Sequence, residues 1–251
     1  MKIVLMGGNG LIGSKLAPLL RAIGHEVLAA SPRTGVNSVT GEGLAQALEG
    51  ASVVVDVTNS PSFADDAVMS FFTASTKNLV DAAAAAGVGH LVALSVVGCD
   101  RLPDSGYMRA KVAQERIIRA GTVPYTIVRA TQFFKFVQSI VDVATVGGTV
   151  LAPAAMFQPI ASDDIAAELA GIVAGPPLEG PVELGGPVTY SMEVALQLFL
   201  ESKGDARRVV TTAEATYFGT PLEERFLVAG AGARQWTTRF EEWLSEVPAR
   251  R

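Results

Sequence analysis

The sequence has very few residues that bind metals through sulfur or imidazole. Cys99 is the only cysteine, and His25 and His90 are the only histidines among 251 residues. A single cysteine excludes an internal disulfide and a thiolate metal cluster, and two histidines argue against a histidine-based metal site. We therefore expect no bound metal.

Basic charge and long apolar segments are also scarce. The chain has 20 Lys and Arg residues against 25 Asp and Glu, a net charge of −5, which argues against a nucleic-acid partner. The longest run without a charge, residues 143–162, is interrupted by Gly147-Gly148, Pro153 and Pro159, so it does not predict a membrane span. The first core strand begins at the N-terminus, which leaves no visible signal peptide. We expect a cytoplasmic protein without a membrane partner, and its oligomeric state stays open.

What the sequence does contain is a glycine turn between a strand and a helix. Residues 3–5 are an unbroken apolar run, typical of a strand buried on both faces of a parallel sheet. Glycines follow at positions 7, 10 and 13, and leucines then recur at helical spacing. Strand, glycine turn and helix in this order are typical of a dinucleotide-binding site.

Each glycine of this turn has its own expected role. Gly7 permits the tight turn, Gly10 lacks the Cβ that would block a pyrophosphate, and Gly13 lets helix and strand pack closely. The N-terminus of the helix offers free N–H groups and a positive dipole end to the phosphates. We expect the cofactor to be bound here by Gly7, Asn9, Gly10, Leu11, Ile12 and Gly13.

The end of the second predicted strand, residues 27–30, indicates which cofactor is bound. NAD enzymes place an acid here to hold the ribose 2′-hydroxyl, whereas NADP enzymes offer an arginine to the 2′-phosphate. The chain has Ser31 and Arg33 here and no acid between Glu26 and Glu42. Because a guanidinium can grip a phosphate in bidentate fashion, Ser31 and Arg33 predict NADP(H). The alternative is an arginine in a solvated loop.

The remaining pattern of strands and helices predicts an α/β fold, a Rossmann-type doubly wound parallel sheet with a small C-terminal substrate-side lobe. Thr58 and Asn59 follow the apolar strand at residues 52–56, at the carboxyl edge where open α/β sheets bind ligands. We expect both to contact the cofactor, and an ordinary turn is the alternative. The other predicted elements of the core are a short strand at 36–40, a helix at 64–86, and strands at 90–98 and 125–129.

We divide the chain into an NAD(P)-binding core, residues 1–152, and the lobe, residues 153–251, integrated with the core. A helix that opens at Ser162 is expected to anchor the lobe, because Ser162 is a suitable N-cap. The sequence of the lobe contains no motif that indicates a substrate. Its other predicted elements are a strand at 182–184, a helix at 191–202, a strand at 207–211 and a terminal helix containing Trp236 and Trp243.

Three polar residues with possible roles in catalysis, Ser95, Tyr107 and Lys111, follow the glycine turn along the chain. Ser95 lies near the end of its strand, and Tyr107 and Lys111 share one face of a helix because they are four residues apart. Together with the glycines, this ordered set resembles the short-chain dehydrogenase/reductase superfamily. Residues 94–98, 107–115 and 129–133 more closely resemble its atypical, NmrA-like branch. The resemblance covers most of residues 1–165.

The resemblance implies roles for these residues. Tyr107 would be the general acid, Ser95 would hydrogen-bond the substrate oxygen, and Lys111 would hold the nicotinamide ribose. The segment after residue 129 would line the nicotinamide and substrate pocket. There we expect Thr131 to contact the cofactor and Gln132, Phe133 and Phe136 to line the substrate pocket.

These observations predict an NADP(H)-dependent oxidoreductase that transfers hydride to or from a carbonyl, alcohol or quinone-like small molecule. Another class of function stays open, since the NmrA-like branch includes members that bind dinucleotide without catalysis: an NADP(H)-binding regulator or redox sensor. An epimerase or isomerase that uses the cofactor without net redox is a third possibility.

Overall fold

The computed structural model describes residues 1–246 and divides into two compact units, each made of several chain segments. The first unit comprises residues 1–95, 106–129 and 165–182, and the second comprises residues 96–105, 130–164 and the chain from 183 onward. The units therefore do not follow the single boundary predicted at residue 152. That the chain divides by function into a cofactor-binding core and a substrate-side lobe stays a prediction.

The first unit is built on a sheet. Its strands are β1 (Lys2–Met6), β2 (Glu26–Ala30), β3 (Val53–Asp56), β4 (His90–Val96), β5 (Tyr125–Ala130) and the start of β9 (Gly180–Gly185). They lie in the order β9-β5-β4-β3-β1-β2, and β2, β1, β3 and β4 pair in parallel. In this register Val4 lies opposite Leu28 on one side and Val54 on the other. Residues 3–5 are fully buried, as their apolar run predicted.

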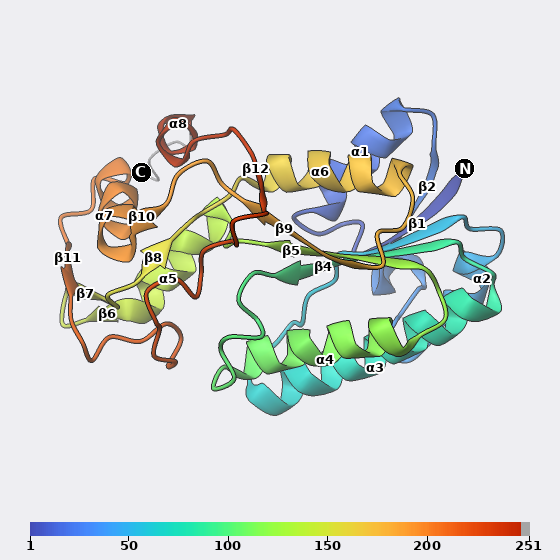
Figure 1. Cartoon of the computed structure of the whole chain (residues 1–251), viewed down its shortest axis with the longest axis horizontal. Helices are drawn as coiled ribbons and strands as arrows, with labels where there is room; N and C mark the ends of the chain where they lie inside the picture. The colour runs from blue at the N-terminus through green and yellow to red at the C-terminus, as the bar shows by residue number, and fades with distance from the viewer. Residues whose placement is uncertain (247–251) are drawn as a thin grey trace. The chain divides into compact units, whose positions relative to one another are not determined.

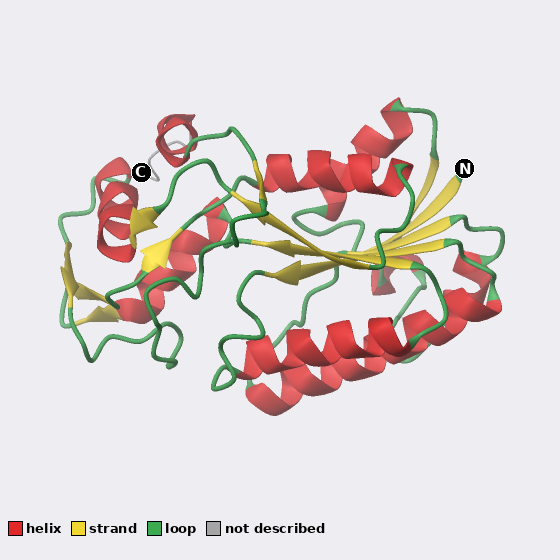
Figure 2. Ribbon diagram, viewed as in Figure 1, coloured by secondary structure: helices red, strands yellow, loops and turns green. Residues whose placement is uncertain are grey.

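Helices cover both faces of this sheet, as Figures 1 and 2 show. They are α1 (Gly13–Ala22), α2 (Leu44–Leu48), α3 (Asp65–Ala85), α4 (Gly106–Ala120) and α6 (Ser162–Ala174). Helices α3 and α4 lie side by side on one face, and α1 and α6 lie on the other. The predicted Rossmann-type, doubly wound α/β fold is confirmed.

The predicted strand at residues 36–40 is wrong. This segment is a series of turns between the 3₁₀ helix η1 (Pro32–Thr34) and α2. The Asn37 side chain accepts the backbone N–H groups of Val39 and Thr40, a local bond that competes with strand pairing. Gly35 and Gly41, at its two ends, have positive φ angles of 78° and 81°. Strand β2 therefore forms the edge of the sheet.

The second unit contains shorter elements. Its helices are η2 (Phe134–Phe136), α5 (Val137–Ala144), α7 (Met192–Ser202) and α8 (Phe240–Glu246). Its strands are β6 (Thr145–Val146), β7 (Thr149–Ala152), β8 (Met156–Phe157), β10 (Tyr190–Ser191), β11 (Arg208–Thr211) and β12 (Arg234–Gln235). They form a sheet in the order β11-β7-β6 and a β10–β8 pair, and β12 pairs with the last residues of β9.

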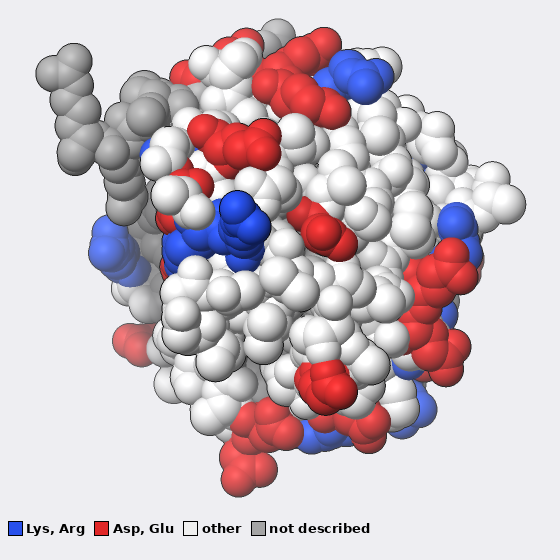
Figure 3. Space-filling model, turned by 90° about the vertical axis from the view of Figure 1, so that its left-hand side faces the viewer, with Lys and Arg blue, Asp and Glu red and all other residues white. Residues whose placement is uncertain are grey.

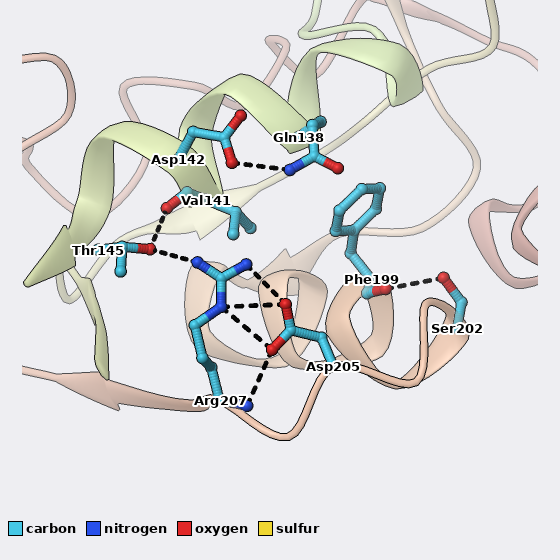
Figure 4. Close-up of polar contacts among 8 residues, drawn as sticks. All are labelled: Gln138, Val141, Asp142, Thr145, Phe199, Ser202, Asp205 and Arg207. Carbon is cyan, nitrogen blue, oxygen red and sulfur yellow. Dashed lines mark hydrogen bonds and ion pairs between the residues drawn. The ribbon is translucent and has the colours of Figure 1, made fainter. Parts of the chain in front are cut away.

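Arg207 ties the end of α5 to the chain that follows α7 (Figure 4). Its Nη1 donates to the Thr145 hydroxyl at 2.8 Å, and its Nη2 lies 2.6 Å from an Asp205 carboxylate oxygen. The Thr145 hydroxyl in turn donates to the carbonyl of Val141 at 2.7 Å. Hydrogen bonds from Arg207 hold the pKa of the Asp205 carboxyl below its ordinary value.

The terminal helix is shorter than predicted. Trp243 lies in α8, but the prediction that Trp236 shares this helix is wrong. The N–H of Trp236 donates to the carbonyl of Gly185 at 3.0 Å, which continues the β12–β9 pairing. Trp243 packs on the buried Phe134, with ring centroids 5.4 Å apart.

The described surface carries both signs of charge. On the face drawn in Figure 3, acidic and basic side chains are interspersed among large uncharged areas. Among residues 1–246, no helix has the length and apolar character needed to cross a membrane. Within the same residues, no cluster of three or more His, Cys, Asp or Glu side chains is arranged to hold a metal ion.

Candidate active site

The glycine turn after β1 is packed so closely that side chains are excluded from it. Gly7 has a φ of 78°, and an added Cβ would lie 3.0 Å from the carbonyl of Val57, just past β3. At Gly13, an added Cβ would lie 2.3 Å from the carbonyl oxygen of Gly7. Sequence reasoning missed Gly8, where a Cβ would lie 2.7 Å from the Ala29 side chain. These glycines bring the turn against β2 and the end of β3.

Space and hydrogen-bond donors are left at the mouth of this turn. An added Cβ at Gly10 would meet only the Gly7 carbonyl oxygen, at 3.2 Å. Helix α1 begins without a side-chain cap and without an acid in its first turn. In the described part of the chain, the N–H groups of Leu11, Ile12 and Gly13 have no hydrogen-bond acceptor. Open space beside free N–H groups at a helix N-terminus fits the pyrophosphate of a dinucleotide.

Three predicted cofactor residues lie close to the end of β2. The Asn9 side-chain amide donates to the Ser31 hydroxyl at 3.1 Å, so the glycine turn and the β2 exit form one corner. Ser31 begins η1, where its N–H donates to the Thr34 hydroxyl at 2.9 Å. Arg33 lies in η1 and is exposed. This corner fits the position of the adenosine ribose in the predicted site.

The end of β3 positions Thr58 and Asn59. Both the N–H and the hydroxyl of Thr58 donate to the same oxygen of Asp56, at 3.0 and 2.6 Å. Asn59 accepts the Tyr107 hydroxyl at 3.3 Å through its side-chain oxygen. The structure therefore brings Asn59 and Tyr107 together, while the Thr58 hydroxyl is already engaged.

Tyr107 stands in the first turn of α4, within an aromatic setting. Its ring packs between Phe63, at a centroid distance of 5.7 Å, and Phe72, at 6.0 Å. Phe72 is fully buried and comes from α3. Packing against these two rings fixes the position of the Tyr107 ring. The residue is half-exposed to solvent.

Lys111 lies one turn further along α4, and its ammonium group is buried. The residue is 2% exposed, and its Nζ donates to the Leu94 carbonyl at 2.8 Å and to the side-chain oxygen of Gln114. The Nζ also lies 4.3 Å from the centre of the Phe72 ring, a cation–π contact. The Lys111 ammonium, which we expected to hold the nicotinamide ribose, is therefore surrounded by other groups of the protein.

Gln114 connects this cation to a buried anion and was not predicted as a site residue. Its side-chain nitrogen donates to Asp56 at 3.0 Å, while its oxygen accepts from Lys111. Gln114 is 1% exposed and Asp56 is 2% exposed. The spacing between Lys111 and Gln114 on one helix is readable from the sequence, but the contact with Asp56 depends on the fold.

Ser95 takes part in a different buried network. Its hydroxyl donates to the Glu115 carboxylate at 2.7 Å. Arg129 binds the same carboxylate through two nitrogens, at 2.8 and 2.7 Å, and Arg119 adds a third contact at 2.8 Å. Burial raises the pKa of Glu115, but the hydrogen bonds and charges of these partners outweigh it and hold the pKa below its ordinary value. The Ser95 hydrogen thus points to Glu115.

The segment after β5 belongs to the second unit, and two of its polar side chains lack partners. Thr131 is 1% exposed and Gln132 is 5% exposed. Within the described residues, the Thr131 hydroxyl and both polar atoms of the Gln132 amide make no hydrogen bond. Phe133 and Phe136 are half-buried, and Phe136 stacks on Phe218 at 5.4 Å. Buried polar atoms without partners are costly unless a ligand binds them.

A family model described as NAD(P)H-binding matches residues 7–176 of the chain. The chain belongs to this NAD(P)H-binding family. The match contains the glycine turn, Tyr107 and Lys111, so a nicotinamide dinucleotide is the kind of cofactor that the NAD(P)H-binding domain takes. The assignment to the NmrA-like branch stays a prediction.

A curated relative of this NAD(P)H-binding protein comes from Streptomyces griseus. It is the (4-alkanoyl-5-oxo-2,5-dihydrofuran-3-yl)methyl phosphate reductase, 33% identical over 144 residues. The aligned part is 52% of this chain and 48% of the relative, so the chain spans about half the length of that protein.

Solved structures share the fold of the NAD(P)H-binding chain over nearly its whole length. The Thermus thermophilus UDP-glucose 4-epimerase in complex with NAD has a TM-score of 0.70 at 19% identity, covering 98% of this chain and 97% of that one. The Bacillus anthracis dTDP-4-dehydrorhamnose reductase in complex with NADP has a TM-score of 0.73 at 15% identity, covering 97% and 96%. These matches show that the chain has the Rossmann-type fold.

Proposed function

We propose that the protein is an NADP(H)-dependent reductase that transfers hydride between nicotinamide C4 and a small carbonyl, alcohol or quinone-like molecule. The observation that carries this proposal is the arrangement of Tyr107 and Lys111. They lie one turn apart on α4, with Lys111 bonded to the β4 carbonyl of Leu94 and Tyr107 bonded to Asn59 beyond β3. The glycine turn lies against the same end of β3.

The chemistry assigns a proton transfer to Tyr107. When bound, the nicotinamide supplies or accepts the hydride. Reduction of a carbonyl leaves a developing oxyanion, and Tyr107 would protonate it as general acid. The ammonium of Lys111, buried one helical turn away, favours the phenolate that remains after the proton leaves. The Tyr107 hydroxyl donates to Asn59, so its hydrogen would have to turn from Asn59 to the substrate oxygen before the proton transfer.

The choice of NADP(H) over NAD(H) rests on the corner at the end of β2. Asn9 and Ser31 are joined by a hydrogen bond there, and the exposed Arg33 follows in η1. A guanidinium beside hydroxyl and amide donors suits a 2′-phosphate. The sequence places no carboxylate between Glu26 and Glu42 to repel that phosphate.

The curated relative supports the substrate class. Its name describes a reductase of a dihydrofuranylmethyl phosphate whose ring carries alkanoyl and oxo groups. This favours a small carbonyl compound as the substrate here, in keeping with proton donation by Tyr107.

A second function, a dinucleotide-binding regulator without catalysis, is favoured by a separate observation. The Ser95 hydroxyl donates to Glu115 rather than outward, and the Lys111 ammonium is bonded to Leu94 and Gln114. Ser95 would have to turn away from Glu115 before its hydrogen could stabilise a substrate oxygen.

NADPH oxidation across a panel of aldehydes, ketones and quinones separates the two functions. We expect Tyr107→Phe to lower kcat by about 10²–10⁴-fold, the usual contribution of general acid catalysis, with little change in NADPH affinity. Tyr125→Phe, which removes a hydroxyl at the start of β5, is the matched control and should leave kcat unchanged. Full activity in Tyr107→Phe would contradict the proton-donor role. Tight NADPH binding by the unmutated protein without turnover of any panel compound would favour the regulator.

A further inference from the structure

The second unit contains a polar cavity that is lined by none of the site residues described above. Its volume is about 350 Å³, which lies within the range of small-molecule pockets. Five polar residues, far apart in the sequence, line it: Arg101, Gln158, Thr189, Arg225 and Gln235. Residues 228–231 also line the cavity.

The cavity is positively charged. Arg101 and Arg225 both line it, and no Asp or Glu is among its lining residues. Within residues 1–246, neither guanidinium forms an ion pair with a carboxylate. A carboxylate beside the cavity, that of Glu183, accepts the N–H of Gly230 at 2.7 Å. Two guanidinium groups facing one small cavity repel each other, and an anion bound between them removes that cost.

The Arg101 guanidinium is held in place by the backbone. Its Nη2 donates to the Val228 carbonyl at 3.1 Å, which leaves its other N–H groups for a ligand. The turn that carries Arg101 begins at Gly98, whose φ is 81° and where an added Cβ would lie 2.1 Å from the Phe226 carbonyl oxygen. The glycine therefore allows the turn to sit against the segment that lines the cavity.

Gln158 also lines the cavity and is buried. It is 3% exposed, its amide nitrogen donates to the Gly186 carbonyl at 2.8 Å, and its oxygen accepts the Ala229 N–H at 3.0 Å. Both ends of this side chain are thus bonded to backbone. The wall is positioned before any ligand arrives, which lowers the ordering cost of binding.

We propose that this cavity binds a phosphate-class dianion carried by a small molecule. Arg101 and Arg225 would neutralise its two charges, and the Thr189 hydroxyl and the Gln235 amide would donate to its remaining oxygens.

Calorimetric titration of the chain, residues 1–251, with inorganic phosphate measures binding to the cavity. It needs neither the cofactor nor turnover. We expect Arg225→Gln to weaken phosphate binding by about tenfold or more, the loss typical of one charge-assisted hydrogen bond. The double variant Arg101→Gln/Arg225→Gln should abolish binding. Arg208→Gln on β11, also exposed but outside the cavity, is the matched control and should bind as the unmutated protein does.

Phosphate can also bind at the glycine turn, so Arg33→Ala and saturating NADPH serve as further controls. Binding that persists in saturating NADPH and in Arg33→Ala, but is weakened in Arg225→Gln and lost in the double variant, supports the cavity. Binding that is unchanged in the double variant, or no phosphate binding by the unmutated protein, overturns the proposal. Acetate that binds as tightly as phosphate overturns the preference for a dianion. None of these results depends on NADPH oxidation, so a failure of the proposed reductase activity is seen separately.

Discussion

The buried bridge from Lys111 through Gln114 to Asp56 makes a quantitative prediction. All three residues are at most 2% exposed, and Gln114 both accepts from the ammonium and donates to the carboxylate. Gln114→Leu keeps the volume of the side chain but removes both hydrogen bonds. The charged groups remain buried, and each loses one of its partners.

The expected loss follows from two opposing effects. A hydrogen bond to a charged group contributes about 1.5–3 kcal/mol, so the two bonds contribute about 3–6 kcal/mol. Burying a leucine side chain in place of the amide raises the free energy of unfolding by about 1.5–3 kcal/mol. Asp56 keeps its bonds from Thr58, and Lys111 keeps its bond to Leu94, so neither charge is left alone. We expect the free energy of unfolding to fall by roughly 2 kcal/mol.

Urea denaturation near neutral pH, followed by far-UV circular dichroism, measures this loss. Gln138→Leu on α5 is the control, because Gln138 is an exposed helical glutamine bonded to Asp142 at 2.8 Å. Its free energy of unfolding should change by no more than about 0.5 kcal/mol. If Gln114→Leu were no more destabilising than this control at an unchanged m-value, the bridge would not stabilise the buried charges and the reasoning would be wrong.

Three other predictions follow from the glycine turn, the β2 corner and the Glu115 network. Gly13→Ala should clearly lower the thermal stability, because its Cβ would lie 2.3 Å from a carbonyl oxygen. Gly171→Ala is the control: its Cβ would have nothing within 4 Å, and the change should stabilise α6 by up to about 1 kcal/mol. Arg33→Ala should reduce the preference for NADPH over NADH about tenfold or more in calorimetric titrations, and equal affinities in the unmutated protein would contradict the assignment. Glu115→Gln should cost about 3–5 kcal/mol near neutral pH, because it leaves the buried Arg129 unpaired. Since folding lowers the pKa of Glu115, its contribution is present above its ordinary pKa, and the cost should shrink in acid denaturation series below about pH 4.3.

Strands β1, β3 and β4 were predictable from sequence because each contains an unbroken apolar run, at residues 3–6, 53–55 and 91–94. The failures occurred where local patterns were ambiguous. Val36 and Val39 fit a short strand, but the Asn37 side chain bonds the local backbone instead. Trp236 was grouped with Trp243, yet it continues the pairing of a strand too short to recognise.

The spacing of the candidate site residues along one helix was predictable from the sequence, but their contacts were not. Spacing on one helix predicts that Tyr107 and Lys111 share a face, and it did not indicate that the Lys111 ammonium would be buried. That result depends on Phe72 from α3 and on Leu94 from β4, which spacing does not reveal. The Ser95 hydroxyl is directed to Glu115 for the same reason, since its partner is set by how α4 packs.

The interleaving of the two units limits how such a protein can be rearranged by gene fusion. The chain passes from one unit to the other five times, at residues 95–96, 105–106, 129–130, 164–165 and 182–183. A gene cut at residue 152 would separate the first unit from α6 and from the buried Ile165 and Leu169. An exchange of specificity between relatives would therefore have to replace several stretches at once or proceed by point substitutions.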